Sequence, residues 1–191
     1  MTIDLDTRAG LPEELRLLLE RFPRDIWPAH ANLGPLAQFW LQIHEGFRDT
    51  SSKLQARAVD FREGRMTATE YKDWFAPRLN VLLGHLHGHH QIEDFQFFPL
   101  FAAAEPRLVR GFEILEQDHE AIHETLGALV DSANALLKAD DANADQLRFA
   151  ADRYAGINEH LLRQLHRHLE DEEDLIIPLI LDRGEGPLGI G

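Results

Sequence analysis

HHQIEDFQFFPLF, residues 89–101, and HLEDEEDLIIPLI, residues 168–180, are two copies of one pattern. The copies align without a gap, lie 79 residues apart, and share His, Glu, Pro and Leu at equivalent positions. In each copy Glu follows His by four residues, as His89–Glu93 and His168–Glu172. In a helix this spacing stacks the two side chains on one face. The repeat therefore predicts two helices that each present a histidine together with a carboxylate.

Apolar residues upstream of each pair show which face of the helix it occupies. At about 100° per residue, Leu82 and Leu86 share a sector with the first pair, and Leu161 and Leu165 with the second. The histidines and carboxylates are therefore expected to point into the core. An unpaired ionised carboxylate there would cost several kcal/mol, so the pattern predicts a compensating partner.

The other two predicted helices supply further histidines. His44 lies in the apolar stripe of residues 33–62, and His119 lies in the stripe of residues 107–138. His123 follows one turn after His119 and also points inward. The candidate metal ligands are His44, His89, Glu93, His119, His123, His168 and Glu172. Five histidines and two carboxylates suit two octahedral ions with carboxylate bridges, and favour Fe, Mn or Zn over Ca or Mg.

The periodicity along the whole chain indicates an all-α fold. It predicts four long helices, over about 33–62, 67–98, 107–138 and 144–178, and a short extra helix over 11–21. Short linkers between long helices favour an antiparallel up-down-up-down four-helix bundle. We expect an N-terminal extension (1–31), the bundle (32–181) and a flexible Gly- and Pro-rich tail (182–191).

Composition restricts the chemistry and the partners. The chain of 191 residues has no cysteine, which excludes disulfides, iron–sulfur ligation, thiolate zinc sites and cysteine nucleophiles. A net charge of -14 and a pI near 5.1 oppose binding to nucleic acid or to anionic membranes. Without a targeting segment or a long apolar run, we expect a soluble cytoplasmic protein. The sequence does not predict an oligomeric state.

Together these motifs resemble the hemerythrin-like, HHE cation-binding family. The resemblance covers about residues 32–181 and rests on His44, HHQIEDFQFFP, DHEAIH and HLEDEEDLIIP. It implies four antiparallel helices around a non-heme di-iron centre. The histidine candidates would be terminal ligands, and Glu93 and Glu172 would bridge the irons. The implied functions are binding of O2 or NO, iron handling or redox sensing, rather than turnover of an organic substrate.

The resemblance leaves three ligand assignments open. Oxygen-carrying members usually place the fourth-helix carboxylate five residues after its histidine, which is Glu173 here, so Glu172 and Glu173 are both candidates. Many members lack the second histidine of the third helix, so His123 is either a ligand or a neighbour of the ligands. His85, one turn before His89, is expected beside the ligands rather than among them.

Two other classes of metalloprotein share parts of the pattern. HEAIH, residues 119–123, matches the HExxH motif of zinc hydrolases, but Glu120 would point away from the two histidines. Ferritin-like di-iron oxidases or peroxidases place ExxH on two helices, whereas the fourth helix here has none. Both classes are alternatives to the hemerythrin-like interpretation, and zinc or manganese is an alternative to iron.

Overall fold

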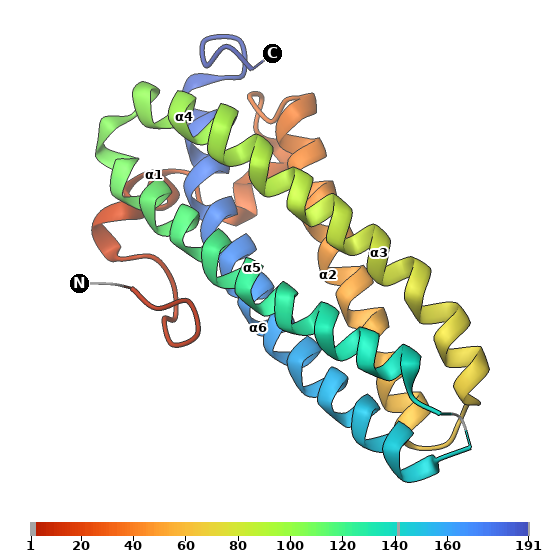
Figure 1. Cartoon of the computed structure of the whole chain (residues 1–191). Helices are drawn as coiled ribbons and strands as arrows, with labels where there is room; N and C mark the ends of the chain where they lie inside the picture. The colour runs from red at the N-terminus through yellow and green to blue at the C-terminus, as the bar shows by residue number, and fades with distance from the viewer. Residues whose placement is uncertain (1–2, 141, 191) are drawn as a thin grey trace. The chain divides into compact units, whose positions relative to one another are not determined.

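Helices make up most of the chain in the computed structural model, which describes residues 3–140 and 142–190 (Figure 1). The elements are η1 (Glu13–Leu15), α1 (Leu17–Arg21), η2 (Arg24–Ala29), α2 (Pro35–Arg62), α3 (Ala68–Ile92), η3 (Glu93–Phe97), α4 (Phe98–Ala104), η4 (Pro106–Leu108), α5 (Val109–Lys138) and α6 (Ala144–Arg183). The described residues contain no strand, which confirms the predicted all-α class. The antiparallel topology and the division into extension, bundle and tail stay predictions.

Two of the long helices end later than the sequence predicts. The helix expected to end near Phe98 passes through the π-helical turn η3 and continues as α4 to Ala104. The fourth helix was expected to end near Pro178 but continues to Arg183. Proline removes a backbone hydrogen bond, at a cost of about 3 kcal/mol. The apolar residues on both sides of Pro178 are fully buried, and their packing outweighs that cost. They are Ile176, Ile177, Leu179 and Ile180.

Side-chain caps set the first residues of two long helices. At the start of α3, Thr67 Oγ1 accepts from the Glu70 backbone N–H, and the Glu70 carboxylate accepts from the Thr67 N–H. This is a capping box, which satisfies backbone donors at the helix end. At the start of α6, Asn143 accepts from the Gln146 N–H in the same way. No helix within the described ranges is long and apolar enough to cross a bilayer.

The chain divides into two compact units, each described here by itself. The first comprises residues up to Gly46, His89–Glu120 and residues from His166 onward; the second comprises Phe47–Gly88 and Ala121–Leu165. The long helices α2, α3, α5 and α6 each contribute a segment to both units.

The second unit has an aromatic core. Tyr71 stacks on Phe61 at 4.8 Å between ring centroids and on Phe75 at 5.3 Å. Phe75 also meets the ring of Tyr154 edge-on at 4.7 Å, and both tyrosines are fully buried. These rings supply a large apolar contact area.

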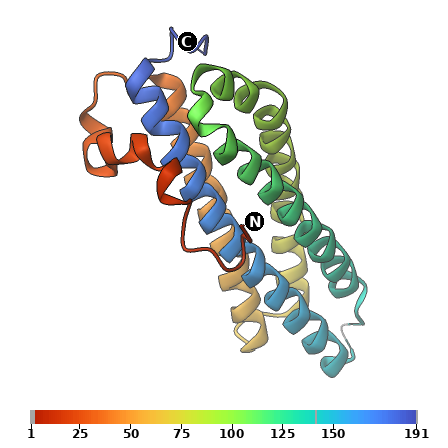
Figure 2. The ribbon, with the colours of Figure 1, turned by 90° about the vertical axis from the view of Figure 1, so that its left-hand side faces the viewer.

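The first unit includes the N-terminal segment, residues 3–31, which lies along α6 (Figure 2). Its apolar side chains are part of the unit's hydrophobic core: Leu11, Leu15, Leu18, Phe22 and Trp27. The Trp27 indole also donates to the carbonyl of Phe22 at 2.8 Å. Packing of this kind fixes the segment as an integral layer of the unit.

Within the first unit, the residues that follow α6 contact the start of α2. The Glu185 carboxylate accepts from the Ala37 backbone N–H at 2.8 Å, and Leu188 is buried. The predicted flexibility of residues 182–191 stays a prediction.

Glu105 gives a test of the fold that depends on pH. Its carboxylate accepts hydrogen bonds from Arg107 and, on α6, from Arg183. These bonds, those from Arg107 above all, lower the pKa of Glu105 from 4.5 to about 2. An acid whose folded pKa is lowered stabilises the fold above its unfolded pKa and loses that contribution as pH falls through the folded pKa.

We expect Glu105→Gln to lower the free energy of unfolding at pH 7, because it removes the charge that pairs with Arg107 and Arg183. The loss should be only about 1 to 2 kcal/mol, because water screens the exposed arginines. The difference should shrink between pH 4.5 and about 2. Urea titrations at pH 7, 5, 4 and 3 measure it. The control is Glu113→Gln, which removes an exposed pair with Arg110 and should change little. A loss of stability that did not depend on pH would contradict this account of Glu105.

Candidate metal centre

Histidines and carboxylates from four helical segments meet inside the first unit. Seven side chains form two groups whose ligand atoms lie within 4.8 Å of one another: His90, His119 and His168 in one, and His44, His89, Glu93 and Glu172 in the other. We call them the three-histidine group and the mixed group. All seven are buried except His89, whose side chain is 11% exposed. The arrangement offers two adjacent positions for a metal ion.

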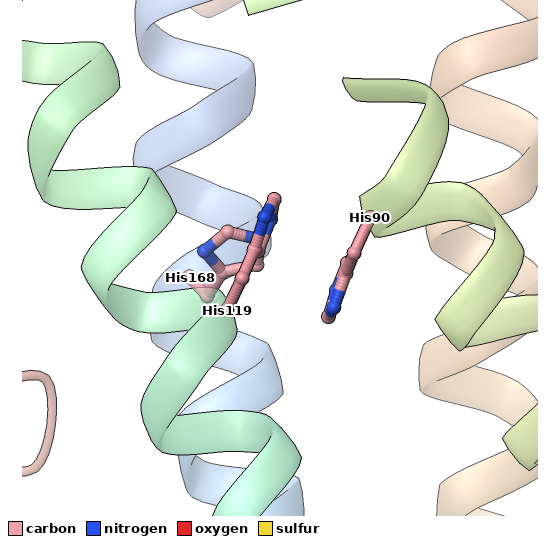
Figure 3. A group of neighbouring side chains, drawn as sticks. All are labelled: His90, His119 and His168. Carbon is pink, nitrogen blue, oxygen red and sulfur yellow. The ribbon is translucent and has the colours of Figure 1, made fainter. Parts of the chain in front are cut away.

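The three-histidine group is drawn from three helices. His119 on α5 and His168 on α6 lie together, with His90 of α3 facing them (Figure 3). The Nε2 atoms of His119 and His168 are 3.1 Å apart, and the His90 ring stacks on that of His119 at 3.9 Å. One ring nitrogen of each histidine therefore lies within 4.8 Å of a nitrogen of the other two.

The two glutamates each face both groups. Glu93 Oε1 lies 2.9 Å from His89 Nε2, and its Oε2 lies 3.6 Å from His119 Nε2. Glu172 does the same with His44 and His168: its Oε1 is 3.4 Å from His44 Nε2. Its Oε2 is 3.2 Å from His168 Nε2. Each carboxylate thus presents one oxygen to each group, which is the geometry of a bridging ligand.

The buried polar atoms of this cluster fit a metal better than they fit one another. Among the described residues, neither oxygen of Glu93 accepts a hydrogen bond, and neither does Oε2 of Glu172. Buried polar atoms are normally paired, and a buried unpaired carboxylate is expensive. A cation between nitrogen and oxygen atoms would compensate them, and this donor set suits Fe, Mn or Zn. The residues present therefore fit a pair of metal ions.

The pKa values of the buried glutamates and histidines also indicate that the cluster holds more negative charge than it can pair. Burial raises the pKa of Glu93, and the nearby Glu172 raises it further. Burial also tends to raise the pKa of Glu172, but His44 and His168 outweigh it and lower the value. Burial tends to lower the pKa of His168, but its contacts with the carboxylates of Asp118 and Glu172 raise it to about 9. Protonated histidine thus supplies the positive charge that a metal ion would bring.

Three of the histidines are held from behind by carboxylates. The Nδ1 contacts are His44 with Glu173 at 3.1 Å, His119 with Asp94 at 2.7 Å, and His168 with Asp118 at 3.2 Å. A carboxylate at Nδ1 fixes the ring orientation and leaves Nε2 directed at the metal position. The rings are therefore oriented for ligation by contacts outside the two groups.

The geometry distinguishes Glu172 from Glu173. Glu172 lies in the mixed group and accepts from the Trp40 indole at 2.5 Å. Glu173 points to His44 Nδ1 and to Arg24 instead, so it lies behind a histidine rather than between the groups.

The structure does not bring His123 into either group of described residues. His123 belongs to the second unit, where its ring lies 5.4 Å from that of His87. His85, expected beside the ligands, is exposed in the second unit and joins neither group.

Sequence reasoning missed His90. At about 100° per residue, His90 falls on the flank of the apolar stripe of its helix, whereas in the structure it is fully buried in the three-histidine group. The signal that could have identified it is its position three residues before Glu93, since i, i+3 side chains also share a helix face. The π-helical turn that begins at Glu93 is a local departure of a kind often found at functional sites.

His90 and His123 provide a matched pair of variants. We expect His90→Ala to reduce the metal content from about two ions per chain to about one, because the three-histidine group loses a nitrogen donor. His123→Ala should retain about two. Elemental analysis after anaerobic Fe(II) loading and desalting measures both, with circular dichroism to verify folding. Loss of metal in His123→Ala but not in His90→Ala would contradict the assignment.

Comparison with protein-family models matches the hemerythrin HHE cation binding domain over residues 36–180. Searches of curated proteins and of solved structures each returned no match. The matched range covers well over half of the chain and contains all seven side chains of the two groups. The chain belongs to the hemerythrin HHE cation binding domain family.

Proposed function

We propose that this protein holds two iron ions, one in each group, and reversibly binds a diatomic ligand, O2 or NO. The observation that supports this most is the pair of buried glutamates, each with one oxygen toward each group. The three-histidine group would hold one iron and the histidines of the mixed group the other, with Glu93 and Glu172 between them. When bound, a ferrous pair supplies the electrons and open coordination for a diatomic ligand.

The two groups differ in how many nitrogen donors they offer. The mixed group has two histidines and the other group three, and both share Glu93 and Glu172, so the mixed group would leave more of its metal position free. His89 in this group is also the one side chain of the seven that is not fully enclosed. A small external ligand would therefore have a free coordination position at the mixed group and access to it past His89.

Aromatic rings line the side of the mixed group next to His89. The Trp40 ring lies 6.0 Å from that of His89 and 4.9 Å from that of Phe97, and Phe101 is fully buried beside them. Such a wall excludes water, which favours an uncharged diatomic ligand over a polar substrate. Trp40 also orients Glu172 through its indole N–H.

Neither of the other candidate functions has a comparable observation in its favour. A hydrolase using HEAIH needs His119 and His123 on one zinc, whereas His123 joins neither group and Glu120 is exposed. A ferritin-like oxidase uses four carboxylates, whereas the groups contain two. With fewer anionic donors, high-valent iron is less stabilised, which favours ligand binding over oxidation. Iron handling and redox sensing are compatible with the same site.

Metal content and colour test the proposal directly. We expect about two irons per chain in untagged protein. A visible absorption band should bleach with dithionite and return in air, because the iron pair changes oxidation state without leaving the site. Elemental analysis and absorption spectroscopy measure this. One zinc per chain and no visible band would contradict an iron function.

The stoichiometry of oxygen uptake separates binding from turnover. The reduced protein should take up about one O2 per iron pair and release it under argon, because reversible binding does not consume O2.

Glu172→Gln should abolish uptake because it removes a donor shared by both groups. Glu170→Gln, an exposed position in the same acidic run, should not. Continuous O2 consumption in the presence of excess reductant would identify an oxidase instead. Uptake of NO but not O2 would assign the ligand as NO.

A further inference from the structure

The N-terminal segment places a buried arginine behind the three-histidine group. The Arg8 side chain is 4% exposed, and its Nη1 donates to Asp118 at 2.6 Å while its Nη2 contacts the other oxygen of that carboxylate. Asp118 in turn faces Nδ1 of His168 at 3.2 Å. Arg8 Nε also donates to Asp171 at 2.7 Å. The planar guanidinium thus fixes Asp118 by two parallel contacts.

A second arginine of the same segment lies behind the mixed group. Arg24 Nη1 donates to Glu173 Oε2 at 2.8 Å, and Glu173 Oε1 faces Nδ1 of His44 at 3.1 Å. Arg24 is held in turn by Asp174, at 2.7 Å from its Nε, and by the carbonyl of Glu170. This arrangement repeats the order of the first one: arginine, carboxylate, histidine Nδ1.

Both arginines lie outside the part of the chain that the family model matches, which begins at residue 36. The segment that carries them is itself fixed, because its apolar side chains are buried in the core of the first unit. The carboxylates they hold are 110 and 149 residues away along the chain. One packed segment therefore reaches one histidine of each group.

We infer that the N-terminal segment is a clamp for both metal positions, in which Arg8 and Arg24 act as positioning residues for His168 and His44 through Asp118 and Glu173. The inference rests on the proposed metal-binding function. A carboxylate held by a guanidinium cannot rotate away from the ring it orients. Contacts of this kind behind a metal ligand typically change metal affinity about 10- to 100-fold when they are removed.

The experiment uses the full chain loaded with Co²⁺, whose visible absorption reports occupancy without iron redox chemistry. Excess EDTA is added, and the loss of absorption gives the release rates. We expect Arg8→Gln to accelerate release of the ion in the three-histidine group about 10-fold, and Arg24→Gln to do so for the mixed group. Because each arginine serves one group, about half of the absorption change should become fast in each variant.

Two other arginines provide matched controls. Arg62→Gln removes an ion pair with Asp152, at 3.1 Å from the Arg62 Nε, and no contact with a carboxylate that faces a histidine. Arg21→Gln removes a pair with Asp182. Both should release Co²⁺ at the wild-type rate. If Arg8→Gln fails to fold because its site is buried, Arg24→Gln, whose side chain is 44% exposed, still tests the inference.

Double variants separate positioning from general stabilisation. If Arg8 acts through Asp118, adding Arg8→Gln to Asp118→Asn should not increase the release rate further, and likewise Arg24→Gln with Glu173→Gln. Independent, multiplying effects would overturn the inference, as would wild-type release rates in both single variants. Failure of the wild-type chain to retain Co²⁺ would instead overturn the proposed metal-binding function.

Discussion

Two glutamates buried among five histidines set the requirements that the rest of the first unit meets. Removing a carboxylate from water costs several kcal/mol unless hydrogen bonds or opposite charge replace the lost solvent. Glu93 has no hydrogen bond among the described residues, and Glu172 is compensated by the Trp40 indole N–H and by His44 and His168, whose pKa values are raised. A pair of cations satisfies all of these atoms at once, which is why the cluster is best understood as a metal centre.

Outward from the metal centre, the histidines are followed by carboxylates and the carboxylates by arginines. The histidine Nε2 atoms and glutamate oxygens point inward, and carboxylates contact the outward Nδ1 atoms of three of the rings. Two of those carboxylates are held by Arg8 and Arg24 of the N-terminal segment. The outer carboxylates and the arginines therefore pair with one another and with the histidines, whereas the oxygens of Glu93 would be compensated by a cation.

The site is asymmetric although the sequence repeat that builds it is nearly symmetric. Each copy of HxxxE contributes one glutamate that faces both groups, but the adjacent His90 has no counterpart beside His168, where Leu169 stands. The extra histidine gives one group three nitrogens and leaves the other with two. That difference, together with the partial exposure of His89, is what directs a small ligand to one metal position in the proposed function.

The sequence by itself determined the helices, their inward faces and six of the seven side chains in the two groups, because four-residue spacing and apolar stripes are local properties of a helix. It left Glu172 and Glu173 open, and it named His123 as a ligand instead of His90. Those choices depend on how neighbouring helices face one another and on the π-helical turn at Glu93. Only the tertiary structure brought Arg8 and Arg24 to their carboxylates, since contacts between residues more than a hundred positions apart leave no periodic signal in the chain.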